Sequence, residues 1–139
     1  MTRTLAILKP DSVAAGNAGK ILAHLEGEGF KIVAIRKMHL SREQAEAFYE
    51  VHKERPFYGS LVDFMTSGPI MPLALERDDA MPYLREVMGA TNPEEAAEGT
   101  IRKLYAGSIE ANAIHGSDSP ENAGEELRFF FSRADLIAS

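Results

Sequence analysis

The sequence predicts an α+β fold of the split β-α-β (ferredoxin-like) kind, in which helices cover one face of an antiparallel sheet and a helical hairpin is inserted. Short apolar segments that stop at turn residues alternate with segments of helical periodicity. The chain begins in the order strand, helix, strand, and two helices then follow each other. With a right-handed crossover, this order fits a sheet covered by helices. A parallel doubly wound sheet is the alternative.

The first forty residues supply the strand, helix and strand. Residues 3–8 are apolar and stop at Lys9-Pro10-Asp11, as a buried strand does when it ends in a turn, so Lys9 is expected at the end of a strand. Residues 19–28 carry apolar side chains at helical spacing, and Gly29 closes them as a C-terminal cap. Residues 30–40 then resume as a strand.

The middle of the chain is predicted to form the helical hairpin. Ser41 and Gln44 have the spacing of a capping box, and the helix that they open carries an apolar stripe. Residues 60–67 form a second short helix that ends at Gly68, and a strand follows over residues 70–75. The turn between the two helices places Phe57 at the tip of the hairpin.

The rest of the chain is predicted as three helices and a loop. Residues 79–88 form a helix closed by Gly89, and Asn92 caps a further helix with a proline in its first turn. Residues 107–119 are loop-like, and the last helix opens at Ser119. Because there is no internal repeat, low-complexity tract or linker, residues 1–139 are expected to form a single domain.

Composition excludes several classes of function. The chain is 45% hydrophobic and 26% charged, with no apolar run of spanning length and no leader-like start, so we expect a cytoplasmic protein that does not enter a membrane. The net charge of −6 argues against general binding of nucleic acid or of an anionic membrane. The absence of cysteine excludes disulfides, thiolate metal sites and a thiol nucleophile.

His115 is the first candidate for chemistry. It lies in the segment Asn112-Ala113-Ile114-His115-Gly116-Ser117-Asp118, among an amide, a hydroxyl, a carboxylate and a glycine. A free imidazole titrates near ~6.5, so much of it is neutral at neutral pH, with one ring nitrogen free to attack. Histidine also forms covalent intermediates, and a phosphoryl group is its natural cargo. The alternative is that His115 merely sits in a polar loop.

Glu126 is the second candidate. It lies close to the apolar face of the last helix, where a carboxylate needs either water or a hydrogen-bond donor. If it meets His115 or Ser117, it fixes the orientation and tautomer of the imidazole ring. A glutamate that simply reaches water from the edge of the core is equally consistent with the spacing.

An anion site and a base site are open possibilities. Lys9, Arg85 and Arg102 could contact phosphate together with Thr91, although any one of these cations could be ordinary surface charge. Phe57 could stack on a nucleobase, or it could pack into the hairpin. Residues 14–21 resemble a Walker A loop but lack its first glycine and its final Ser or Thr, so a P-loop is rejected. No residue cluster has the spacing of a fixed metal site.

The chain closely resembles the nucleoside diphosphate kinase family. The resemblance is carried by the histidine segment of residues 112–118, which is that family's signature, and by Lys9-Pro10-Asp11, Phe64-Met65-Thr66-Ser67-Gly68-Pro69 and Gly89-Ala90-Thr91-Asn92-Pro93. It extends over essentially the whole chain in order. It implies a ping-pong exchange in which the γ-phosphoryl of a nucleoside triphosphate, mainly ATP, passes with magnesium to Nδ1 of His115 and then to a nucleoside diphosphate, so that nucleotide pools are balanced.

The resemblance also implies a role for each residue that matches the family. Lys9 and Asn112 would hold the sugar hydroxyls, and Phe57 would stack on the base between Leu61 and Ile109. The other matches fall into two groups: Arg85, Thr91 and Arg102 would bind the phosphates, and Tyr49, Ser117 and Glu126 would support the histidine. Stacking without readout of base edges gives broad base and sugar specificity. No metal ligand from the protein is implied, since Mg²⁺ is carried mainly by the substrate phosphates.

Family members form homo-oligomers, so the chain is expected to be a tetramer or, alternatively, a hexamer. A second interpretation makes His115 a phosphocarrier toward protein partners. A third makes the chain a non-catalytic binding module, since split β-α-β sheets serve many functions. The acidic net charge and the lack of paired aromatics on a basic strand argue against specific nucleic-acid binding by such a module.

Overall fold

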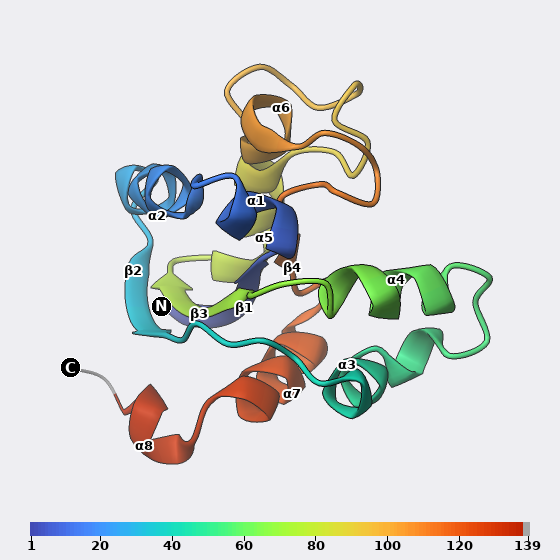
Figure 1. Ribbon diagram of the computed structural model, residues 1–139. Helices are drawn as coiled ribbons and strands as arrows, with labels where there is room; N and C mark the ends of the chain where they lie inside the picture. Colours follow the sequence, from blue (N-terminus) through green and yellow to red (C-terminus); the bar gives the residue numbers. More distant parts are fainter. Residues whose placement is uncertain (138–139) are drawn as a thin grey trace.

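The computed structural model describes residues 1–137 and contains a four-stranded antiparallel sheet with the strand order β2-β3-β1-β4 (Figure 1). All three strand pairs are antiparallel, so the parallel alternative is wrong. The elements are β1 (Thr2–Leu8), α1 (Pro10–Ala14), α2 (Ala18–Gly27), β2 (Lys31–Ile35), α3 (Arg42–Phe48), the 3₁₀ helix η1 (Glu50–His52), α4 (Tyr58–Met65), β3 (Met71–Arg77), α5 (Ala80–Met88), α6 (Ile101–Tyr105), β4 (Ile114–Gly116), α7 (Pro120–Phe130) and α8 (Arg133–Leu136).

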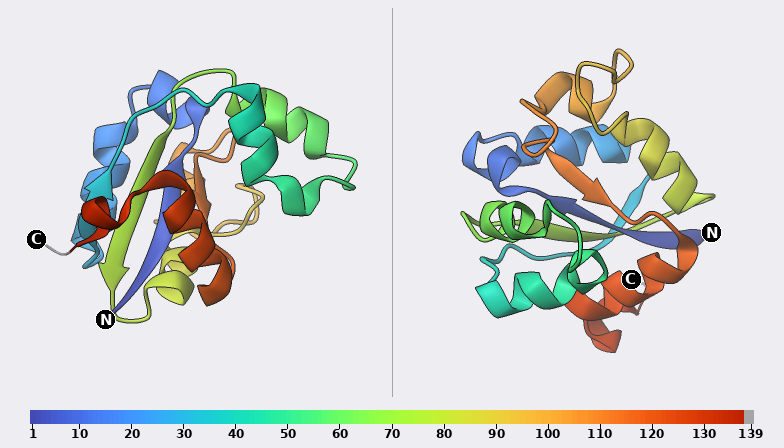
Figure 2. Two further views of the ribbon diagram at one scale, coloured as in Figure 1. Left: turned by 90° about the horizontal axis from the view of Figure 1, so that it is seen from below. Right: turned by 90° about the vertical axis from the view of Figure 1, so that its right-hand side faces the viewer.

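Helices cover both faces of the sheet, whereas the sequence predicted helices on one face. Successive side chains of the central strand β1 point to opposite faces. Leu5 and Ile7 pack in one cluster with α3, α4 and α7, and Ala6 and Leu8 pack in another with α2, α5 and α6. Figure 2 shows the sheet between these two layers. The uninterrupted apolar run of β1, fully buried from Leu5 to Leu8, is typical of a strand covered on both sides.

The expected hairpin is confirmed. Ser41 accepts a hydrogen bond from the N–H of Gln44, and the Gln44 side chain accepts one from the N–H of Ser41, so the capping box opens α3 as predicted. The second helix, α4, begins two residues earlier than expected, at Tyr58. The last helix, α7, is also confirmed, with Pro120 in its first turn and Ser119 as its cap.

Three elements differ from the prediction. The chain does not turn at Lys9-Pro10-Asp11 but enters the short helix α1, with proline at its first position. The strand predicted for residues 30–40 ends at Ile35, and beyond it Met38 forms only an isolated bridge with Ile70. No helix starts at Asn92: its side chain accepts the N–H of Glu94 as a cap would, but the backbone bonds that follow, from Glu95 to Asn92 and from Ala96 to Pro93, close turns of four residues only.

The predicted loop of residues 107–119 contains the short strand β4, which pairs with β1 along one edge of the sheet. Three residues were too few to show a strand pattern in the sequence. None of the helices in residues 1–137 combines the length and the apolar character that a crossing of a bilayer requires.

Candidate active site

A cleft of about 340 Å³ lies between the hairpin of α3 and α4 on one side and β4, α6 and the loop before β4 on the other. Figure 1 shows the hairpin extending beside β4, with α6 on the far side. The side chains that line the cleft come from segments far apart in the sequence. They are Lys9, Phe48, Tyr49, Val51, His52, Phe57, Leu61, Arg85, Thr91, Arg102, Asn112, Ile114, His115, Gly116, Asp118, Asn122 and Glu126.

The position of His115 follows from the alternation of β4. His115 pairs with Ile7 of β1, while its neighbours Ile114 and Gly116 are buried. Paired residues on adjacent strands point to the same face, so the imidazole lies on the face that α3 and α7 cover. Its side chain retains 23% of its exposure and lines the cleft. The backbone of His115 is therefore fixed in the sheet, while its side chain remains accessible to a molecule bound in the cleft.

Glu126 fixes the His115 ring. Nε2 of His115 lies 2.9 Å from Oε1 of Glu126, and the hydroxyl of Ser117 donates to the same oxygen at 2.8 Å. With Nε2–H donating to the carboxylate, Nδ1 carries the free lone pair of a neutral imidazole. This contact brings together two residues that are eleven positions apart in the chain, and in this tautomer it leaves Nδ1 as the ring nitrogen with a free lone pair.

Two aromatic rings pack edge-on against the imidazole. The Phe48 ring lies 5.7 Å and the Tyr49 ring 6.3 Å from that of His115, measured between centroids. Tyr49 is only 5% exposed, and burial, with the Glu126 carboxylate nearby, raises the pKa of its phenol well above its usual value. Tyr49 thus stays neutral, and the packing limits rotation of the imidazole.

Arg102 and Arg85 contact the backbone of β4 on either side of His115. Arg102 donates to the carbonyl of Ile114 at 2.8 Å and to that of Gly89 at 3.1 Å, and Arg85 donates to the carbonyl of Gly116 at 3.4 Å. Burial, and secondarily the charge of Arg85, lower the pKa of Arg102 to about 10, so it remains charged at neutral pH. Its buried Nε has no hydrogen-bond partner among the described residues. Two positively charged side chains therefore line the same cleft as the His115 imidazole.

Lys9 and Asn112 form a second polar cluster at the cleft. Nζ of Lys9 donates to Oδ1 of Asn112 at 2.8 Å and to the carbonyl of Glu110 at 2.9 Å. The Asn112 amide in turn lies 3.4 Å from the carbonyl of Thr91. Lys9 is 7% exposed, and desolvation lowers its pKa to about 8. The charge of Arg102 acts in the same direction, whereas those of Asp11 and Glu110 oppose it.

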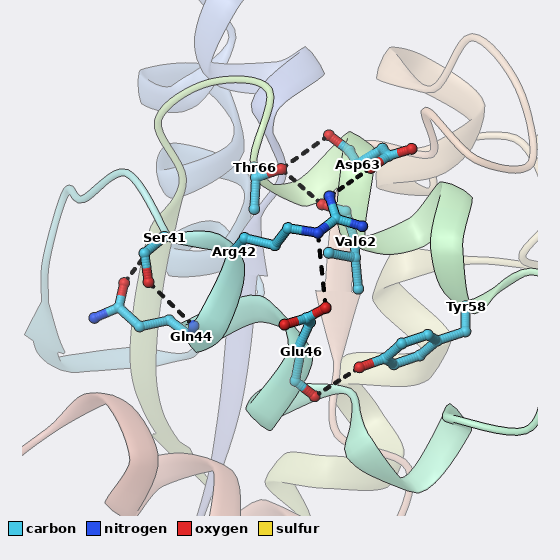
Figure 3. A network of polar contacts seen from close by, with 8 residues as sticks. All are labelled: Ser41, Arg42, Gln44, Glu46, Tyr58, Val62, Asp63 and Thr66. Atoms are coloured by element: carbon cyan, nitrogen blue, oxygen red, sulfur yellow. Dashed lines mark hydrogen bonds and ion pairs between the residues drawn. The ribbon is translucent and has the colours of Figure 1, made fainter.

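The hairpin supplies the apolar side of the cleft. Phe57 is 48% exposed at its tip and lies 5.4 Å from the His52 ring between centroids, with Leu61 one turn further along the chain. Figure 3 shows the polar contacts that join α3 to α4: Arg42 donates to Asp63 at 2.8 Å, and the Tyr58 hydroxyl donates to the carbonyl of Glu46 at 3.2 Å. These contacts hold the two helices at a fixed separation and leave the Phe57 ring available for stacking.

Ten of the twelve residues singled out in the sequence line this cleft, and the remaining two lie elsewhere. Ser117 is fully buried behind Glu126, where it acts on the carboxylate. Ile109 is 60% exposed, because the loop closes on itself through the hydrogen bonds from Gly107 and Ser108 to Ala111 and holds Ile109 at its tip. The expectation that Ile109 completes an apolar slot therefore finds no support in this conformation.

Several lining residues were not anticipated. His52, Asp118 and Asn122 are the polar ones, and Asn122 donates to Asp118. The capping box predicted the helix before His52, but nothing in the spacing showed that η1 would turn His52 back toward Phe57. No group of three or more potential metal ligands occurs among residues 1–137.

Comparison with known proteins gives a consistent result. A family model described as "Nucleoside diphosphate kinase" matches residues 2–136. The nucleoside diphosphate kinase of Halorhodospira halophila is 60% identical over 99% of this chain and 96% of its own length. That of Persephonella marina is 55% identical over 97% of this chain and 96% of its own length.

Solved structures agree with this result. The nucleoside diphosphate kinase of Aquifex aeolicus superposes with a TM-score of 0.96 at 45% identity, covering 98% of this chain and 99% of that one. A halophilic nucleoside diphosphate kinase from Halobacterium salinarum, solved in complex with CDP, gives a TM-score of 0.93 at 38% identity, covering 99% and 91%.

Proposed function

This chain belongs to the nucleoside diphosphate kinase family, and we propose that His115 is the residue through which it transfers phosphoryl groups between nucleotides. The enzyme is a phosphotransferase that works by a ping-pong route, so the interpretation as a non-catalytic binding module is wrong. The observation that carries the proposal is the pairing of His115 Nε2 with Glu126, which leaves Nδ1 free on a ring that lines a cleft together with two arginines.

The first half-reaction needs no separate base. The lone pair of Nδ1 attacks the γ-phosphorus of a nucleoside triphosphate, mainly ATP, the bond to the bridging oxygen breaks, and the diphosphate leaves with that oxygen. In the second half-reaction, a terminal phosphate oxygen of a different diphosphate attacks the phosphorus of phosphohistidine, the P–N bond breaks with its electron pair returning to Nδ1, and a triphosphate and free His115 result. Phosphoryl transfer depends mostly on positioning and charge stabilisation. Arg85 and Arg102 supply the positive charge, and Glu126 stabilises the ring as its charge changes.

Thr91 adds a hydroxyl to the same phosphate region. It lies in the turn after α5 and lines the cleft beside Arg102. We assign Lys9 and Asn112 to the sugar hydroxyls, since their bonded ammonium and amide present both a donor and an acceptor.

The base is bound by stacking, which explains broad specificity. Phe57 offers an exposed ring, and Leu61 adds an apolar surface beside it. Stacking contributes roughly 1–3 kcal/mol per base and is tolerant of sequence. The Halobacterium relative was solved with CDP, a pyrimidine nucleotide, which is consistent with this proposal for the present chain. The physiological consequence is exchange that balances the triphosphate pools.

Mg²⁺ enters as part of the nucleotide substrate, bound to its phosphates. The ion keeps several waters and is commonly held by substrate phosphates with one or two carboxylates. Asp118, which lines the cleft, is an oxygen donor of the kind that Mg²⁺ accepts, directly or through its water. When bound, the ion neutralises phosphate charge in addition to the two arginines.

The assembly and setting of the enzyme are part of the proposal. Residues 1–139 act as one domain, and the chain forms a homo-oligomer, expected to be a tetramer with a hexamer as the alternative. Light scattering coupled to size-exclusion chromatography distinguishes these masses. A cytoplasmic location is proposed on the ordinary globular composition and is tested by cell fractionation.

Brief incubation with γ-labelled ATP and Mg²⁺, followed by peptide mapping, tests the role of His115. Acid-labile, alkali-stable label confined to the His115 peptide is expected, and label elsewhere would overturn the assignment. His115→Ala should abolish turnover, while Arg102→Ala should lower it by about 10²–10³-fold because one charge-stabilising donor is lost. Near-normal exchange between free nucleotides by His115→Ala would contradict the proposal.

A further inference from the structure

Ala113 has a backbone conformation that an L-amino acid rarely adopts. Its φ is 75°, and the N–H of Ile114 donates to the carbonyl of Asn112 across it at 2.9 Å. This combination is the rarer kind of γ-turn, in which the central residue has positive φ and is strained. Such a conformation persists only where the surroundings over-determine it. The turn stands between Asn112 and the strand that carries His115.

Residues at the start of α1 hold both polar groups of Ala113. Its N–H donates to Oδ2 of Asp11 at 3.0 Å, and its carbonyl accepts the Ser12 hydroxyl at 2.8 Å. The backbone N–H of Lys9 donates to the same carbonyl at 3.0 Å. Ala113 is fully buried, so water does not replace these bonds. Oδ1 of Asp11 is buried and has no hydrogen-bond partner among the described residues. The carboxylate of Asp11 is therefore used to accept the N–H of Ala113.

Neither Asp11 nor Ser12 lines the cleft. Asp11 also acts on Lys9 through its charge, whereas Ser12 is uncharged, so an effect of Ser12 on bound nucleotide passes through the turn. The turn determines where Asn112 stands relative to Lys9. The 2.8 Å bond between the Asn112 amide oxygen and Nζ of Lys9 joins the two side chains assigned to the sugar. Lys9 and Ser12 both belong to the segment in which β1 runs into α1. This segment therefore supplies one of the residues assigned to the sugar, Lys9, and also supports the turn that places the other, Asn112.

We propose that Asp11 and Ser12 are positioning residues for the nucleotide sugar: they hold Ala113 in its strained turn and thereby place Asn112 beside Lys9. The inference rests on the proposed function, which assigns Lys9 and Asn112 to the sugar hydroxyls. It explains why a strained residue stands at this point. If the backbone of Ala113 relaxed to a common conformation, the side chain of Asn112 would point in a different direction and would no longer lie beside Lys9.

Two nucleotide acceptors separate positioning from general stability. Ser12→Ala and Asp11→Ala should each lower kcat/KM for ADP by roughly tenfold, the usual size of a lost hydrogen bond to a positioned group. With 2′,3′-dideoxy-ADP, which offers no hydroxyl to Asn112, the same variants should lose less than about twofold. Circular dichroism and thermal melting check that each variant is folded, and Ser12→Ala serves where Asp11→Ala does not fold.

Ala113→Gly provides the matched test of strain. Glycine adopts positive φ without a steric penalty, so the turn no longer depends on Asp11 and Ser12, which we call the clamp. The single variant should keep near-normal activity, and the double variant Ser12→Ala with Ala113→Gly should recover most of the loss of Ser12→Ala with ADP. Equal losses with the two acceptors, or a double variant no better than Ser12→Ala, would overturn the proposal.

Asn112→Ala in the same assay distinguishes failure of this inference from failure of the proposed function. If it discriminates between the two acceptors and the clamp variants do not, the clamp is refuted while the sugar assignment stands. If Asn112→Ala itself shows no discrimination, the sugar assignment fails. The clamp is then decided by backbone chemical shifts of Ala113 in deuterated protein: positive φ retained in Ser12→Ala refutes it, and loss of positive φ supports it.

Discussion

Raising the pH should inactivate the enzyme by removing the proton of Lys9. Burial lowers the pKa of this ammonium from 10.5 to about 8, and the nearby Arg102 acts in the same direction. The charged form donates to Asn112 and to the carbonyl of Glu110, and it is the form assigned to the sugar. A neutral amine keeps the position but loses the charge and one of its donors. The alkaline side of the activity profile therefore reports this residue.

The size of the effect follows from the pKa. One pH unit above about 8, about one-tenth of the lysines remain charged, so kcat/KM should fall roughly tenfold if only the charged form is productive. The profile is measured for ATP as donor with a saturating diphosphate, because in a ping-pong exchange kcat/KM for the donor reports ionisations of the unphosphorylated enzyme. Lys9→Arg is the control: its activity is expected to be lower, but its charge does not titrate in this range, so its alkaline limb should be flat.

Stability should change in the opposite direction over the same pH range. The lysine of the unfolded chain keeps its proton up to 10.5, whereas that of the folded chain loses it near 8. Between these values the unfolded state binds more protons, so the free energy of unfolding rises with pH. Below about 8 both states are charged, and folding carries the full cost of burying the ammonium. Falling activity with rising resistance to denaturant thus excludes alkaline unfolding as the cause. A wild-type profile that stays flat to about pH 9, or the same fall in Lys9→Arg, would refute the reasoning.

Four further substitutions test other parts of the site. Glu126→Gln should lower kcat by on the order of 10²-fold in stopped-flow phosphorylation, since the amide no longer stabilises the imidazole; an unchanged rate would count against the pairing. Phe57→Ala should raise KM by the equivalent of about 1–3 kcal/mol for purine and pyrimidine diphosphates alike, and a loss confined to one base would contradict stacking. Gly116→Ala should destabilise the protein by about 1–3 kcal/mol in denaturant titrations, because the added Cβ would lie 2.5 Å from the sulfur of Met88 in α5. Unchanged stability would show that the Met88 side chain moves aside at little cost. Arg102→Lys should lose about 10²-fold in kcat despite its retained charge, whereas full activity would mean that charge alone suffices.

Much of the fold could be predicted because its signals are local. The capping box of Ser41 and Gln44 fixes the start of α3 through two hydrogen bonds within four residues. The apolar run of β1 needs no partner to be recognised as a buried strand. By contrast, β4 spans three residues and exists because β1 offers it an edge, so no pattern within its own sequence could reveal it.

The same distinction holds for the site. The residue types predicted His115 and Glu126 as candidates, but the 2.9 Å contact between them depends on how α7 packs against the sheet. His52 could not be found, because its approach to Phe57 is set by the 3₁₀ turn of η1. Ile109 was expected in the cleft because of the resemblance to the family, whereas the hydrogen bonds that close its loop decide its exposure.

The edge position of β4 accounts for the backbone contacts that Arg102 makes. The hydrogen bonds of β4 to the sheet use Ala113, whose carbonyl accepts from Lys9, and Ser117, whose N–H donates to the carbonyl of Leu5. In an antiparallel pair such bonds alternate along the strand, so the carbonyls of Ile114 and Gly116 point away from β1, on the side where no further strand pairs in residues 1–137.

These outward carbonyls, one on each side of His115, are the groups that Arg102 and Arg85 contact. Arg102 also reaches the carbonyl of Gly89 at the end of α5, so one planar guanidinium joins the edge strand to that helix. A lysine ammonium is a point charge on a flexible stem and cannot span both carbonyls in a fixed plane. Arg102→Lys should therefore keep the charge but lose its position relative to Nδ1, and the loss should appear in kcat rather than in nucleotide affinity.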